Sequence, residues 1–291
     1  MSNLNSLSHF LPELILTVTV LTAVIADLFY HKDESRKVAW WVLGGLALTL
    51  FAIQMGGSTV TDLFMGTIAL DPFSEYFKIL VLIATVLVIL TSFNSNELQD
   101  YRVGEYYSIL AIMVFGLFLM ASAIDILMVY LAIEVVSIMS FFLAGYLKKN
   151  PHSNEASLKY VIYGAFSSGI MLYGLSILFG LTGTTKFVEM QAAISGLSPD
   201  SNLALIISAV FILAGFGYKI SAVPFHFWTP DVYEGSPTTI TAYLSVAPKA
   251  AGFAMLIRFF NQVFGDSSAL VSESWQALNQ IPWPQLMGVL A

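Results

Sequence analysis

Three ionisable side chains, those of Glu134, Lys219 and Lys249, occur inside long apolar segments of this sequence. A charge near the centre of a bilayer is unfavourable by at least ~2.5–3.5 kcal/mol on insertion scales, and such residues usually mark ion or substrate pathways. A carboxyl group and two amines can each take up and release a proton. Together they predict a proton path through a membrane protein.

Glu134 has hydroxyl groups on its own helix face. If its segment is helical, Tyr130 at i−4 and Ser137 at i+3 share that face. Hydroxyl partners can hold a carboxyl group in either protonation state. The alternative is a structural ion pair that holds two helices together.

Lys219 lies close to an expected helix break. Pro224 cannot donate a hydrogen bond and crowds the carbonyl of Ile220. Gly215 and Ala222, on the face of Lys219, leave room for water or a close partner. A break at membrane depth is tolerated where protein or a water-filled cavity receives the freed backbone groups. Lys219 is therefore a candidate proton carrier, and snorkelling of its ammonium to the interface is disfavoured by the apolar residues on both sides.

Lys249 repeats this pattern, because it follows Pro248 directly and has Ser245 at i−4 and Gly252 at i+3. Pro248 alone would indicate only a kink, but two lysines beside two prolines favour a shared function. His226 lies seven residues after Lys219, on the same face if the helix continues. Its imidazole titrates near neutral pH, which suits proton transfer, although an interfacial position is the alternative.

The composition indicates a membrane protein. Of 291 residues, 57% are hydrophobic and 11% are charged, whereas soluble domains carry about 25% charged residues. The net charge of −7 and the lack of a basic patch argue against nucleic acid as a partner. The absence of cysteine excludes disulfides, thiolate metal sites, iron–sulfur clusters and attached c-type haem. No metal-binding or cofactor-binding pattern occurs, so electron-transfer cofactors are expected in other polypeptides.

The fold class expected is an all-α polytopic bundle with proline-interrupted seventh and eighth spans. Apolar runs of suitable length predict eight spans, roughly residues 11–30, 38–54, 77–93, 108–123, 126–147, 158–181, 203–227 and 238–260. Residues 281–291 resemble the start of a ninth span. We expect one membrane domain, divided into three leading spans (1–100), a five-helix unit (101–262) and a loop with an incomplete second unit (263–291).

The distribution of basic residues predicts the orientation. Loops after the first, third and fifth spans hold seven Lys and Arg residues, and the opposite side holds three. By the positive-inside rule, the seven-charge side faces the cytoplasm and the N-terminus lies outside. No cleavable signal peptide is evident.

Two segments resemble a known family. They are residues 159–185 and the run from Pro224 to Thr238, which continues to the Ser-Val-Ala-Pro-Lys motif ending at Lys249. Both look like the N-subunit family of proton-pumping NADH:quinone oxidoreductase, respiratory complex I, and the resemblance extends across the whole chain. The Trp-Thr-Pro-Asp-Val-Tyr-Glu-Gly-Ser-Pro segment starting at Trp228 favours this family over its L and M sisters and over multisubunit cation/proton antiporters.

The resemblance implies a role for each residue. Glu134 matches a fifth-span glutamate thought to pair with the seventh-span lysine, which is Lys219. Lys249 matches the eighth-span lysine, and His226 the histidine between the two. The implied fold has fourteen spans with two inverted repeats, of which this chain would contain the first. NADH, FMN, iron–sulfur clusters and quinone would bind in partner subunits. The partners of this chain would be the other membrane subunits of complex I and the lipid bilayer. The membrane would be a bacterial plasma membrane.

Three alternatives stay open at this point. A cation/proton antiporter subunit of the same fold would depend on sodium. A retinal-type photoreceptor would use a seventh-span lysine as a Schiff base, but an eighth span and a proline before the second lysine count against it. A structural scaffold would tolerate neutralisation of all three charges.

Overall fold

The computed structural model describes residues 3–56 and 60–265, and within them it contains eight helices long and apolar enough to cross a membrane. The eight are α2 (Leu11–Phe29), α3 (Val38–Met55), α4 (Pro72–Ser92), α5 (Gly104–Ser122), α6 (Ile126–Ala144), α7 (Pro151–Thr182), α9 (Asn202–Ile220) and α11 (Thr238–Phe259). The eight predicted spans are thereby confirmed. The predicted ninth-span start lies outside the described residues.

Short elements connect these helices. They are α1 (Asn3–His9), α8 (Phe187–Ser195), α10 (Thr229–Gly235), 3-10 turns at Lys32–Lys37, Asn96–Leu98 and Pro199–Ser201, a π-helical turn at Phe260–Phe264, and the hairpin strands β1 (Thr61–Leu63) and β2 (Ile68–Leu70). The two strands are antiparallel, with Thr61 opposite Leu70.

Polar caps set where several helices begin. Asp71 accepts a hydrogen bond from the backbone N–H of Ser74, and the Ser74 hydroxyl bonds back to Asp71, so α4 starts with a capping box. Asp125 caps α6 with a single bond, accepting from the N–H of Leu127, 2.8 Å away. Asn150 caps α7 ahead of Pro151. Because of this cap, α7 has 32 residues, a length of about 48 Å, and begins seven residues before the predicted span.

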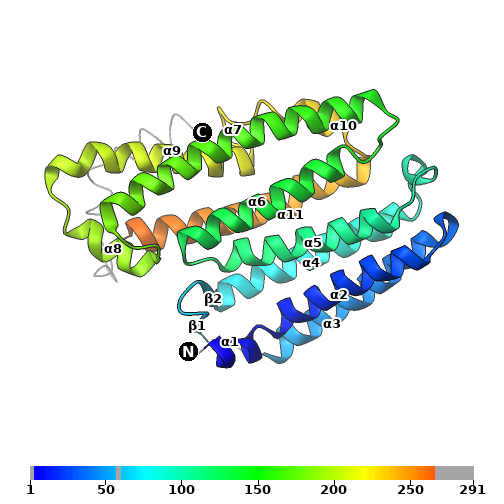
Figure 1. Ribbon diagram of the computed structural model, residues 1–291, viewed down its shortest axis with the longest axis horizontal. Coiled ribbons are helices and arrows are strands. Elements are labelled where there is room, and N and C mark those ends of the chain that lie inside the picture. Colours follow the sequence, from blue (N-terminus) through cyan, green and yellow to red (C-terminus); the bar gives the residue numbers. More distant parts are fainter. Residues whose placement is uncertain (1–2, 57–59, 266–291) are drawn as a thin grey trace.

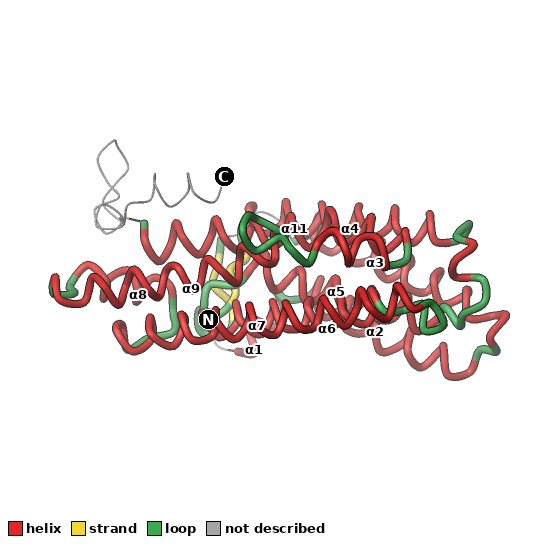
Figure 2. The backbone as a smooth tube through the Cα atoms, turned by 90° about the horizontal axis from the view of Figure 1, so that it is seen from above, coloured by secondary structure: helices red, strands yellow, loops and turns green. Residues whose placement is uncertain are grey.

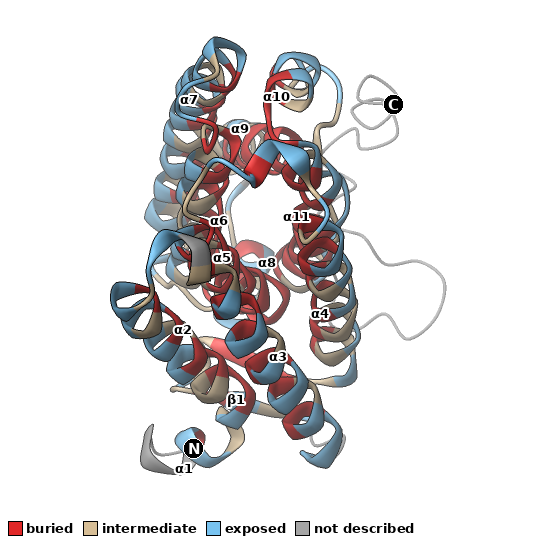
Figure 3. Ribbon diagram, turned by 90° about the vertical axis from the view of Figure 1, so that its right-hand side faces the viewer, coloured by how far each residue is buried: buried red, intermediate tan, exposed pale blue. Residues whose placement is uncertain are grey.

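The helices lie side by side in an elongated bundle (Figures 1 and 2). The closest pairs are α2 with α3, α5 with α6, α7 with α9, and α4 with α11. Among the eight, α5 is the most buried, and Figure 3 shows it between its neighbours while α2 and α3 expose more of their surface. Helix α5 thus lies in the interior of the bundle, and α2 and α3 form a flank.

The connections gather at the two ends of the bundle (Figure 1). At one end, Arg36 donates to the carbonyl oxygen of Phe93 at 3.1 Å, and the N–H of Lys149 donates to the Tyr101 hydroxyl at 3.3 Å. At the other end, the N–H of Ile124 donates to the Thr67 carbonyl, 3.1 Å away. The loops rich in Lys and Arg therefore share one end, as alternating spans require.

The two proline sites differ. Helix α9 ends at Ile220, Ser221 follows with a φ of +60° in the left-handed region, and the chain becomes helical again at Thr229. The interruption of the seventh span is confirmed. In contrast, α11 continues through Pro248 without a break, so the interruption predicted in the eighth span is wrong. Proline there removes only its own hydrogen bond to the preceding turn.

Candidate functional site: buried ionisable groups between α6, α7, α9 and α11

Glu134 lies half-buried on α6 and faces α7. The hydroxyl of Ser168 on α7 donates to a carboxylate oxygen of Glu134 and lies 3.4 Å from the hydroxyl of Tyr130. Tyr130 and Glu134 are one turn apart, so the predicted shared face is present. Sequence reasoning did not identify Ser168, because a partner on another helix leaves no local signal.

Lys219 is buried, with 3% of its surface exposed. Its ammonium donates to the hydroxyl of Ser137 at 3.2 Å. Ser137 lies one helical turn after Glu134. Within the described residues, no ion pair of 4.0 Å or less joins Glu134 to Lys219, although their opposite charges attract each other at longer range. The Glu134–Lys219 pair implied by the resemblance is therefore not a direct ion pair in this structure. Instead, Glu134 is bound by Ser168 and Lys219 by Ser137.

The end of α9 favours a cation at position 219. Lys219 lies in the last helical turn, where the negative end of the helix dipole stabilises a positive charge. Two of the carbonyl groups freed by the break have partners: the indole of Trp228 donates to the Tyr218 carbonyl at 3.1 Å, and the N–H of Ala222 donates to the Gly217 carbonyl at 2.8 Å. The break therefore places a lysine at a helix C-terminus without leaving these carbonyl groups unpaired.

The glycines near Lys219 allow close packing. A Cβ atom added to Gly215 would lie 2.4 Å from the sulfur of Met171. Gly215 is therefore covered by Met171 of α7, so the room that the sequence expected for water or a close partner is taken by a close partner. A Cβ added to Gly252 on α11 would lie 2.9 Å from Ile220 Cγ2 and 3.5 Å from Lys219 Cγ. Gly252 thus brings the helix that carries Lys249 against Lys219.

Replacing Gly252 by Val should push α11 away from Lys219. We expect a loss of about 1–3 kcal/mol in stability, typical of overpacking, and a lower Tm in detergent. Gly180→Val is the matched control, because a Cβ at Gly180 has no atom within 4 Å. Equal Tm values for the two variants would show that Gly252 is not a close contact.

Lys249 lies half-buried on α11. Its ammonium is 5.3 Å from the ring centroid of Tyr233 on α10, and it makes no hydrogen bond or ion pair with the described residues. This distance is that of a cation–π contact. Burial raises the pKa of Tyr233 to about 12, so its phenol stays neutral at physiological pH.

His226 lies in the loop between α9 and α10, so the continuous helix that would place it on the face of Lys219 is not present. Its Nδ1 atom is buried without a hydrogen-bond partner among the described residues. Four more such atoms lie in the same segment, in the side chains of Ser221, Thr229, Tyr233 and Ser236. Buried polar atoms normally bond to protein or ordered water, so this segment has the chemistry to hold a short chain of water molecules.

Two further ion pairs lie in the bundle, apart from Glu134, Lys219 and Lys249. Lys78 on α4 lies 2.5 Å from Glu13 on α2, and both side chains are 3% exposed. Arg258 on α11 binds both oxygens of Asp71, at 2.7 and 2.8 Å. These pairs connect the leading spans to each other and to α11. Within residues 3–56 and 60–265, no group of three His, Asp or Glu side chains is arranged to hold a metal ion.

A family model described as NADH:quinone oxidoreductase/Mrp antiporter, transmembrane, matches residues 123–279. The chain is 43% identical over 301 residues to NADH-quinone oxidoreductase subunit N of Anaeromyxobacter sp. (strain Fw109-5), covering 99% of this chain and 58% of the relative. It is 40% identical over 271 residues to NAD(P)H-quinone oxidoreductase subunit 2 of Thermosynechococcus vestitus, covering 92% of this chain and 51% of the relative. The chain spans about half to three-fifths of the length of these curated relatives.

Solved structures agree in fold. A chain of respiratory complex I from Thermus thermophilus matches with a TM-score of 0.71 and 27% identity, covering 85% of this chain and 52% of that chain. A chain of an archaeal membrane-bound sulfane sulfur reductase matches with a TM-score of 0.69 at 19% identity, which is a likeness of fold alone. Because the family model covers more than half of its residues, this chain belongs to the NADH:quinone oxidoreductase/Mrp antiporter transmembrane family.

Proposed function

We propose that this chain is part of a membrane-arm subunit of a proton-translocating NADH:quinone oxidoreductase. The observation that carries the proposal is Lys219, a buried amine in the last turn of the interrupted helix α9, held by the Ser137 hydroxyl. The names of the relatives favour this function over that of a cation/proton antiporter, although the family model includes both.

The residues act as a relay in this proposal. Glu134 attracts a proton to Lys219 when the two charges approach, because an opposite charge stabilises the ammonium. When the pair separates, Lys219 lies in a low-dielectric environment that favours the neutral amine, and its proton passes toward Lys249. His226 and the unpartnered hydroxyl groups of residues 221–236 would hold the water that carries it.

The remaining assignments follow from this function. The chain would contain three leading spans and one five-helix repeat, residues 101–262, with further membrane subunits of the complex as partners. NADH, FMN, iron–sulfur clusters and quinone would bind in partner subunits. The membrane would be a bacterial plasma membrane with the N-terminus outside, because the basic loops share one end of the bundle.

Complementation tests the proposal. The gene for the full-length protein should restore NADH-driven quinone reduction and proton pumping to membranes of its own host lacking it, measured by dye quenching. Replacing sodium by choline should leave pumping unchanged. Failure to restore pumping contradicts the proposal, and sodium-dependent proton exchange without NADH oxidation would show the antiporter function instead.

A further inference from the structure

Tyr233 on α10 contacts the ammonium of Lys249. The ammonium lies 5.3 Å from the centre of the Tyr233 ring and makes no hydrogen bond or ion pair with the described residues. The face of an aromatic ring attracts a cation through its electron density, and a neutral amine lacks that attraction. The contact is therefore favourable only while Lys249 carries a proton.

The acidic residues of α10 do not pair with Lys249. Asp231 forms an exposed ion pair with Lys159 on α7. Glu234 is exposed and has no ion pair of 4.0 Å or less among the described residues. Among these three side chains of α10, the ring of Tyr233 is thus the one that meets the ammonium.

The backbone of Tyr233 is attached to the helix that carries the lysine. Its carbonyl accepts a hydrogen bond from the Thr241 hydroxyl at 2.9 Å. Thr241 lies on α11 ahead of Lys249. The ring and the amine are therefore held from the same helix, and their distance does not depend on a free loop.

The ring of Tyr233 also packs against Trp228, edge to face, with the ring centres 6.0 Å apart. Trp228 is buried, stacks on Tyr160 of α7 with centres 4.4 Å apart, and donates from its indole to the Tyr218 carbonyl at 3.1 Å. Tyr218 directly precedes Lys219. These two aromatic side chains thus connect the broken end of α9 to the position of the second lysine.

We propose that Tyr233 is a positioning residue for Lys249, whose ring holds the ammonium once the lysine has received a proton. This role rests on the proposed function, because it belongs to the same relay. The hydroxyl of Tyr233 has no hydrogen-bond partner among the described residues, and it would only add to the water held by the hydroxyl groups of Ser221, Thr229 and Ser236.

Fluorination of the ring tests this role. Phe and its mono-, di- and trifluorinated analogues at position 233 have nearly the same size, but each fluorine draws electron density from the ring face. In the full-length protein within its assembled complex, NADH-driven pumping per complex should fall stepwise, to about a tenth for the trifluorinated ring, which is within the strength of a partly desolvated cation–π contact. Equal pumping along the series overturns the proposal, since a ring needed only for packing is insensitive to fluorine.

Two ordinary substitutions separate the ring from the hydroxyl. Tyr233→Phe keeps the ring and should pump within about threefold of the unchanged protein, whereas Tyr233→Leu should lose about tenfold. If Tyr233→Phe falls as far as Tyr233→Leu, the hydroxyl is the acting group and the proposal is wrong.

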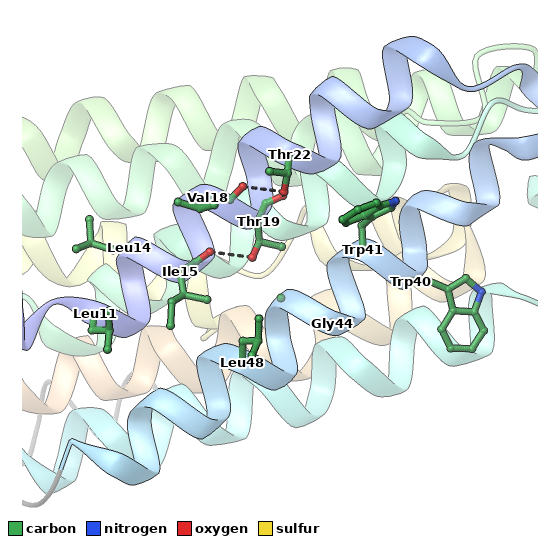
Figure 4. A pocket seen from close by; sticks show the side chains of 11 residues that line it. Leu11, Leu14, Ile15, Val18, Thr19, Thr22, Trp40, Trp41, Gly44 and Leu48 are labelled. Carbon is green, nitrogen blue, oxygen red and sulfur yellow. Dashed lines mark hydrogen bonds between the residues drawn. The ribbon is translucent and has the colours of Figure 1, made fainter.

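Tyr30→Leu is the matched control, because the Lys37 ammonium lies 5.8 Å from the centre of the Tyr30 ring. The Tyr30 hydroxyl accepts from Trp41 at 3.2 Å. Trp41 lines a groove of about 820 Å³ between α2 and α3, whose lining residues include no titratable side chain (Figure 4). Pumping should be unchanged in this variant, and a loss equal to that of Tyr233→Leu would overturn the assignment.

Lys249→Met separates this inference from the proposed function. Fluorination at position 233 should have no further effect in the Lys249→Met background, because the cation is gone. If Lys249→Met loses pumping while fluorination has no effect in the unchanged background, only the role of Tyr233 is wrong. If the full-length protein fails to restore pumping, or if Lys249→Met pumps fully, the relay itself is wrong.

Discussion

Replacing Lys219 by Met should lower NADH-driven proton pumping in the assembled complex by about 10²-fold, the lower range of effects when a proton-transferring group is lost. Met keeps the length and the apolar stem of the side chain but cannot carry a proton. The fold should persist, because Lys219 has no ion-pair partner within 4.0 Å among the described residues, so its replacement breaks no close buried ion pair. The measurement is dye quenching in vesicles, normalised to the amount of assembled complex.

The matched control is Lys148→Met, which makes the same change at an exposed loop residue and should leave pumping unchanged. Ser137→Ala should give an intermediate loss, because it removes the hydroxyl that lies 3.2 Å from the Lys219 ammonium and leaves the lysine in place. Full pumping in Lys219→Met would remove this residue from the relay.

The fold was largely predictable because lipid permits few solutions. A backbone in hydrocarbon must satisfy its hydrogen bonds internally, so each long apolar run implied a helix, and all eight are present. The break after Lys219 was predictable from Pro224, because proline removes a donor and crowds the preceding turn. The same rule failed at Pro248, where α11 accommodates the proline as a single missing hydrogen bond.

The partners in the site were not predictable, because they come from other helices. The sequence identified Glu134 and Lys219, but the serine that binds Glu134 is on α7, 34 residues away. The break after Lys219 was expected, but the path of the chain beyond it was not, and the left-handed residue Ser221 leads into the loop that holds His226. Spacing along one helix reports a shared face, whereas packing between helices decides what that face contacts.

Buried ion pairs were missed for the same reason, and the Glu13–Lys78 pair leads to the second large effect. The two residues are 65 positions apart, their charged atoms are 2.5 Å apart, and both side chains are 3% exposed. Replacing Lys78 alone by Met should destabilise the protein by about 3–5 kcal/mol, because Glu13 is left as an uncompensated buried charge. Thermal unfolding in detergent should show a clearly lower Tm.

The double variant Glu13→Leu/Lys78→Met should recover most of this loss, since an apolar pair of similar volume often matches a buried ion pair in stability. Lys159→Met, which removes solvent-exposed ion pairs with Glu155 and Asp231, is the control and should change stability by at most about 1 kcal/mol. If the double variant is as unstable as Lys78→Met, the contribution of Lys78 is its packing and not its charge. Recovery would instead show that the contact between α2 and α4 requires two side chains of matching polarity at positions 13 and 78. Either an ion pair or an apolar pair would then serve.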